Sequence, residues 1–309
     1  MKSLILFLFF SLATQLCFAQ EYVSLKGKLI AEGTNIPIPY AAITANKYGT
    51  TSKEDGSFTL KLPEESAGEL YIQAIGYRDT VISADRFSSE ELVIYLRTVA
   101  YSLPTAYVSS KTSRKENILA GKPEVAVLKE REGKAIPTFV STGAGLSSGV
   151  LINPKKKHQG GILSKISFYA TEDGFPQAPT IIRILVPDTK LQKNRIYPRS
   201  KFKDLLKEPL IHRGKAGWNT IDVEELNLPT PNKNFILLFT PLDYGDQYRW
   251  INKHQHNKDG LVECYGMAIG TYRDKKLADI YLALQFSQGR LSYAKVRWGT
   301  PAVAVQYVK

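Results

Sequence analysis

Short runs of alternating apolar and polar residues occupy the N-terminal part of the chain. They cover residues 25–33, 39–49, 57–63, 69–77 and 91–97. Turn-forming glycines separate them, at Gly33, Gly49, Gly56 and Gly68. A period of two residues is typical of strands with one buried face, and no helical period lies between the runs. The pattern predicts a β-sandwich over residues 20–100.

The pair Asp55-Gly56 lies between two of these runs. An Asp-Gly pair between alternating strands favours a tight hairpin, because the turn needs a positive φ. A calcium loop would need oxygen ligands at alternate positions and a later glutamate. Lys53 stands at the first such position, and residues 58–62 read as a strand. The sequence therefore predicts a hairpin without calcium.

The alternating pattern returns after residue 137. It covers residues 166–170, 182–186, 280–286 and 303–307. Residues 234–240 are a continuous apolar run, which is expected for a strand that is covered on both faces. We expect one short helix, around residues 202–208. The predicted fold class is all-β, with a second, jelly-roll-like β-sandwich over residues 136–309.

Residues 101–135 differ from both of these regions. Lys, Arg and Glu are frequent there, and the alternation of apolar residues is lost. We expect a connector that is partly helical, with a short helix near residues 125–131.

The first residues of the chain have the pattern of a secretory signal peptide. Lys2 precedes an apolar stretch over residues 4–16, and Cys17 and Ala19 are small residues that suit a cut before Gln20. The sequence thus predicts a signal peptide over residues 1–19 and a periplasmic, outer-membrane-associated or secreted protein. No later apolar run reaches the roughly 20 residues of a membrane-spanning helix, so no transmembrane segment is predicted after cleavage.

Several sequence blocks of the first region resemble the carboxypeptidase-like regulatory domain. The blocks are residues 27–30, 37–43, 49–52, 55–58 and 70–77. The resemblance implies a transthyretin-like, immunoglobulin-like β-sandwich of the kind found in Gram-negative envelope proteins. It implies no peptidase activity, because the regulatory domain does not contain the zinc site. In the second region, residues 165–170, 181–186, 204–206, 211–223 and 234–242 look like blocks of an uncharacterised C-terminal sandwich that follows such domains in envelope proteins.

No catalytic set is visible in the sequence. Residues 145–149 match the G-x-S-x-G pattern, but an apolar strand pattern follows Ser147 where a nucleophile elbow needs a helix. His256 has an acid three residues later, Asp259, but no later histidine completes a zinc site. We therefore expect a protein that is not an enzyme and has no cofactor.

The segment 243–260 is the strongest candidate for a binding site. It is longer than a hairpin needs and contains Tyr244, Tyr248, Arg249 and Trp250, which suit a sugar ring or a protein groove. The alternative is that Tyr248 and Trp250 pack back onto the sandwich.

The same segment contains a weak metal candidate. His254 and His256 would share one side of a strand, with Cys264 as a third ligand. The polar surroundings favour a solvated loop, so no metal is predicted.

Charge restricts the class of partner. The chain has 41 Lys and Arg against 29 Asp and Glu, a net charge of +12. Basic runs occur at 155–158, 190–203 and 273–276. Nucleic acid is not expected, because no nucleic-acid-binding motif is present and the chain carries an export signal. An envelope protein or an anionic glycan fits better.

We expect an exported, non-catalytic binding or assembly module. The alternative is a glycan-binding protein that uses the C-terminal sandwich.

Overall fold

The computed structural model describes most of the chain beyond the expected signal peptide. The described residues are 21–83, 86, 92–99, 115–124, 127, 138–154, 161–189, 191, 195–257, 260–272, 280–287, 290–294 and 300–309. The predicted cleavage site and most of the predicted connector helix lie outside them. Within them the fold is all-β, as predicted. The part of the chain so described has no helix that is both long enough and apolar enough to cross a membrane.

The N-terminal region is a sandwich of two sheets. One sheet contains β4 (Ser57–Pro63), β1 (Tyr22–Ala31) and β7 (Leu92–Leu96), and the other contains β3 (Tyr48–Thr51), β2 (Ala42–Ala45), β5 (Glu69–Gln73) and β6 (Thr80–Ser83), each in pairing order. Buried and exposed residues alternate along β1 and β4. Their inward side chains, such as Leu29 and Leu60, join one apolar cluster with Ile43 and Ile72 of the second sheet. The alternation in the sequence thus identifies the core face correctly.

The turn at Asp55-Gly56 has the predicted geometry but a different place in the topology. Gly56 has φ +78°, and its N–H donates to the Lys53 carbonyl at 2.9 Å. However, β3 pairs with β2, whereas β4 pairs with β1. The expected hairpin is therefore wrong. The turn carries the chain from one sheet to the other, and the apolar faces of both sheets meet in one core.

The C-terminal region is a larger sandwich of two sheets. The eight-stranded sheet contains β13 (Tyr197–Pro198), β21 (Arg290–Ala294), β20 (Ile280–Ser287), β10 (Ser147–Ile152), β17 (Phe235–Pro241), β12 (Thr180–Pro187) and β14 (Phe202–Asp204) in pairing order, with β15 (Leu210–His212) also on β12. The seven-stranded sheet contains β18 (Arg249–Asn257), β19 (Gly260–Ile269), β11 (Ile162–Ala170), β22 (Val303–Val308) and β8 (Glu116–Ala120), with β16 (Gly217–Asp222) on β11 and β9 (Phe139–Ser141) on β19.

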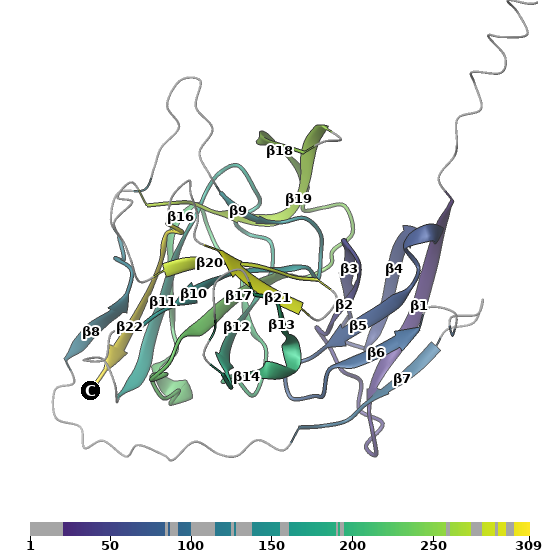
Figure 1. Ribbon diagram of the computed structural model, residues 1–309, viewed down its shortest axis with the longest axis horizontal. Coiled ribbons are helices and arrows are strands. Elements are labelled where there is room, and N and C mark those ends of the chain that lie inside the picture. The colour runs from purple at the N-terminus through teal and green to yellow at the C-terminus, as the bar shows by residue number, and fades with distance from the viewer. Residues whose placement is uncertain are drawn as a thin grey trace, which may run out of the picture.

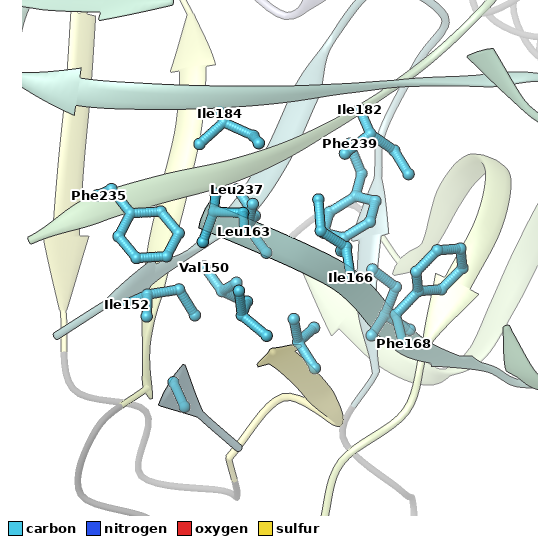
Figure 2. Packing of buried hydrophobic residues seen from close by; sticks show 14 of the residues in the cluster. Val150, Ile152, Leu163, Ile166, Phe168, Ile182, Ile184, Phe235, Leu237 and Phe239 are labelled. Carbon is cyan, nitrogen blue, oxygen red and sulfur yellow. The ribbon is translucent and has the colours of Figure 1, made fainter. Parts of the chain in front are cut away.

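The main core lies between these two sheets (Figure 2). Val150, Ile182, Leu237 and other residues of the eight-stranded sheet interdigitate with residues of β11 such as Ile166. Phe168 of β11 also meets Phe239 of β17 edge to face, with ring centroids 5.3 Å apart. This cluster provides the largest apolar burial in the described chain.

Two sequence expectations for this region are corrected by the structure. The helix expected at 202–208 is absent: a 3-10 turn, η4 (Arg199–Lys201), leads directly into β14, which pairs with β12. Residues 116–120, expected to belong to a connector, form β8 and pair with β22. In both places a free edge of a sheet supplies backbone hydrogen-bond partners, which the local sequence does not reveal.

Strand β17 is buried on both faces, as its continuous apolar sequence predicts. Phe235 and Leu237 point into the main core, whereas Ile236 and Leu238 belong to a second cluster on the outer face of the sheet. Tyr197 and Phe202 are members of this second cluster and cover part of the outer face. A different element must cover the rest.

The N-terminal sandwich supplies that cover. Figure 1 shows β3, β2, β5 and β6 on the side that faces the larger sandwich, with β4, β1 and β7 farther away. Ile75, which follows β5, packs with Ile181 of β12 and with Leu242. The backbones also meet closely, because a Cβ atom added at Gly145 would lie 2.1 Å from the Thr50 carbonyl oxygen.

A buried ion network occupies the polar part of the same outer face. The Asp204 carboxylate accepts hydrogen bonds from Arg183 Nη2 at 2.8 Å and from Arg199 Nη2 at 2.6 Å. The three side chains are between 5% and 8% exposed. Burial alone would raise the pKa of Asp204, but the charges and hydrogen bonds of the two arginines outweigh it and lower the pKa. Asp79 of the N-terminal sandwich lies close enough for both arginine charges to act on its carboxylate.

The turn between the two sheets makes a first prediction. In Gly56→Ala, the new Cβ would lie 2.5 Å from the Leu29 carbonyl oxygen at a φ of +78°. We expect a loss of about 1 kcal/mol or more in the free energy of unfolding, measured by urea titration. Gly68→Ala is the matched control, because its Cβ would meet nothing within 4 Å. Equal stabilities of the two variants would contradict this account of the turn.

The ion network makes a second prediction. Asp204→Asn removes the buried carboxylate to which both Arg183 and Arg199 donate, and should lower the free energy of unfolding by about 3–5 kcal/mol. Asp188→Asn, which removes only an exposed pair with Lys203 at 3.9 Å, should change it by less than about 1 kcal/mol.

The same network predicts how stability depends on pH. Because the folded-state pKa of Asp204 lies below its unfolded value, its contribution is present above about pH 4. That contribution is lost as the pH falls through the folded-state pKa. Asp204→Asn should therefore show a weaker acid dependence than the wild type in urea titrations from pH 6 to pH 2. The same acid dependence in both proteins would contradict the assignment.

Candidate functional site

The segment between β17 and β18 lies where the two sandwiches meet. The Asp243 N–H donates to Thr51 Oγ1 at 2.8 Å, and the Thr50 hydroxyl donates to the Asp243 carboxylate. The Leu242 N–H donates to the Pro179 carbonyl at 2.9 Å. One short segment is thus bonded to both sandwiches, and its conformation depends on both.

Tyr265 holds the backbone of Tyr244 and Gly245 through hydrogen bonds. Its hydroxyl accepts from the Tyr244 N–H at 2.9 Å and donates to the Gly245 carbonyl at 2.9 Å. Burial raises the pKa of the Tyr265 hydroxyl to about 12, so the group keeps its proton and remains a donor at neutral pH. These bonds hold the backbone of Tyr244 in one position.

The Tyr244 side chain is presented to solvent. It is 46% exposed, and the Arg213 guanidinium lies 5.4 Å from the centre of its ring. Arg213 Nη2 also donates to the Tyr244 hydroxyl at 3.2 Å. The cation over the ring and the hydrogen bond at its tip restrict the same side chain, which lowers the entropy lost when a partner covers it.

Tyr40 of the N-terminal sandwich lies near this pair. It is close enough for electrostatic coupling to Tyr244, and its hydroxyl donates to Glu54 Oε1 at 3.2 Å. Its φ of +59° is uncommon for a bulky residue and is held by packing against Ile75, Ile181 and Leu242. Tyr40, Arg213 and Tyr244 together are called the junction surface below. No sequence pattern identifies Tyr40 or Arg213 as part of a site, because they come from different sandwiches.

The other predicted binding residues have different environments. Tyr248 is only 5% exposed and packs with Tyr265, so the alternative of packing onto the sandwich is correct for it. Arg249 forms ion pairs with Asp246 at 3.0 Å and with Glu263 at 2.9 Å. Trp250 is half-buried, and its indole N–H donates to the Gly266 carbonyl at 3.0 Å. Tyr244 is therefore the residue of the predicted set that presents an exposed aromatic ring.

The segment 243–260 is not the long loop that the sequence suggested. Arg249–Asn257 form β18, which pairs with β19, and only residues 242–248 connect β17 to it. Edge pairing with β19 supplies the backbone partners that order this polar sequence.

The metal candidates are spread along the β18–β19 hairpin. His254 and His256 lie on β18, and His256 pairs with Leu261, whereas Cys264 pairs with Trp250 farther along the ladder. Cys264 is buried, and burial raises the pKa of its thiol to about 11. The thiolate that binds metals is therefore disfavoured at neutral pH. Among the residues the structure describes, no cluster of three metal-ligating side chains occurs.

Ser147 is an ordinary strand residue, as expected. It begins β10, is buried, and shares a 2.6 Å hydrogen bond with the Thr240 hydroxyl. A strand follows it rather than a helix, so the geometry of a nucleophile elbow is not formed.

Two small cavities accompany these elements. One is lined by Tyr40, Gln73 and Arg183 at the junction, and the other by Ser141 and Tyr265, and each encloses about 10 Å³. That volume holds about one water molecule, so neither is a site for a larger ligand. A ligand of the junction surface would therefore bind on the exterior of the protein and not in a cavity.

Comparison with known proteins adds little to this geometry. No protein-family model matches the chain, and no curated protein matches it. A chain in "Structure of infectious bursal disease virus Gx strain" is similar at a TM-score of 0.16 and 11% identity, over 92% of this chain and 63% of that one. The chain thus spans 63% of the length of that viral chain. A likeness at this TM-score supports no statement about function.

Proposed function

We propose that this chain is an exported, non-catalytic protein of the cell envelope that binds a protein partner through its junction surface. The observation that carries this proposal is the exposed ring of Tyr244, held by Arg213 above a backbone that both sandwiches fix. The signal-peptide pattern and the resemblance of residues 22–98 to envelope regulatory domains support the location.

The chemistry of the junction surface favours a protein over a sugar. Tyrosine and arginine are enriched among the residues that dominate protein–protein binding energies, particularly when they are rigid before binding. A sugar ring would stack on an aromatic face, and Arg213 already lies over one face of the Tyr244 ring. The glycan-binding alternative remains an outcome of the test below.

Tyr244 provides the test. The mature protein, residues 20–309, is immobilised and exposed to envelope extract, and each captured protein is purified and its binding is measured by titration. Tyr244→Ala should weaken binding about thirtyfold or more, which corresponds to the roughly 2 kcal/mol of a dominant interface residue. Tyr244→Phe keeps the ring and should retain most of the affinity.

Tyr22→Ala is the matched control, because Tyr22 is an exposed tyrosine at the start of β1, away from the junction surface. It should bind like the wild type. Equal binding by Tyr244→Ala and the wild type would overturn the proposal. Retention of the wild type on envelope polysaccharide that Tyr244→Ala abolishes, with no protein captured, would favour the glycan-binding alternative.

A further inference from the structure

The sheet β4-β1-β7 presents a second exposed surface, which does not belong to the junction. Its inward residues, such as Leu29 and Leu60, fill the N-terminal core. The alternate residues therefore point away from the core. The surface they form, called the outer face below, contains Lys26, Lys28, Ile30, Thr59, Lys61, Val93 and Tyr95. Figure 1 shows this sheet on the side of the sandwich that is remote from the larger one.

Positive charge is concentrated on the outer face. Lys26 and Lys28 are two residues apart on β1, about 7 Å along the strand, and Lys61 lies on the neighbouring strand β4. Among the described residues, none of these three lysines forms an ion pair. Glu32, at the end of β1, is already paired with Arg97 at 2.8 Å. The charge of Asp55 interacts with that of Lys28, although the two side chains are too far apart to form an ion pair.

Apolar side chains lie in the same layer as the lysines. The register places Val93 beside Lys28 and Tyr95 beside Ile30. Val93 is 44% exposed and Tyr95 is 55% exposed. The outer face therefore presents exposed aromatic and aliphatic side chains next to lysine ammonium groups, so it is both apolar and cationic.

We propose that the outer face binds an anionic polysaccharide. Carboxylate or sulfate groups along the polymer would lie against Lys26, Lys28 and Lys61, and the apolar face of a sugar ring would lie on Tyr95. A membrane is a poorer fit, because interfacial insertion buries a broad apolar face, whereas Val93 and Tyr95 share the outer face with three lysines. This site is separate from the junction surface and does not depend on a protein partner there.

A pair of charge-matched variants tests this proposal. The full mature chain is titrated with alginate, a polymer of uronic acids, and with neutral dextran. Lys26→Gln, Lys28→Gln and Lys61→Gln are combined in one variant. Lys201→Gln, Lys215→Gln and Lys233→Gln, all exposed in the larger sandwich, are combined in the control. Both variants lose three positive charges, so a general effect of net charge is the same in each.

The expected results differ sharply between the two variants. The outer-face variant should bind alginate at least tenfold more weakly than the wild type, and the control variant should change affinity by less than twofold. Tyr95→Ser should weaken binding severalfold although it leaves the charge unchanged, and dextran should not bind. All of these positions are exposed or half-exposed, so melting temperatures should stay close to that of the wild type.

Three outcomes would overturn the proposal. Equal losses in the two triple variants would show that affinity follows net charge alone. Undiminished alginate binding by the outer-face variant would place any polysaccharide site elsewhere. Binding of poly-glutamate at least as tight as that of alginate, with no effect of Tyr95→Ser, would assign the face to acidic polypeptides.

Discussion

The eight-stranded sheet is apolar on both faces, and burial of Ile181 on its outer face places the N-terminal sandwich against the larger one. In a two-sheet sandwich one face of each sheet can remain in water. Here Ile236 and Leu238 continue an apolar surface on the outer face of the eight-stranded sheet. The segment around Tyr197 covers one part of that surface, and the N-terminal sandwich covers another through Ile75. Burial of the outer face therefore joins the two regions into one structure.

The polar features of the junction follow from that burial. Arg183 lies on the same outer face, and the buried carboxylate of Asp204 compensates its charge there. The segment after β17 emerges at the edge of the contact, where Asp243 bonds to β3. Tyr244 is the next residue and is presented to solvent beside Arg213. The binding surface that we propose is thus a product of the contact between sandwiches rather than of either one alone.

Period and continuity of apolar residues were sufficient to predict the all-β class and the double burial of β17. They failed at positions where the partner is distant in sequence. Phe202–Asp204 read as a helix because their pairing with β12 cannot be inferred locally. Asp55-Gly56 read as a hairpin because an isolated turn does not reveal which sheet receives the next strand. Tyr244 was predicted as a binding residue because its segment is rich in aromatic residues. Tyr40 and Arg213 were not predicted, because only tertiary contacts place them next to Tyr244.

The central claim is that the two sandwiches are coupled energetically across the junction, and a double-mutant cycle between Thr50 and Asp243 measures this most directly. Thr50→Val, Asp243→Ala and the double variant are compared with the wild type by urea unfolding. The Asp243 bond to the Gly245 N–H, at 2.9 Å, is lost in both arms of the cycle and cancels. A hydrogen bond to a carboxylate across the junction predicts a coupling of about 1.5–3 kcal/mol. A coupling below about 0.5 kcal/mol would contradict the account.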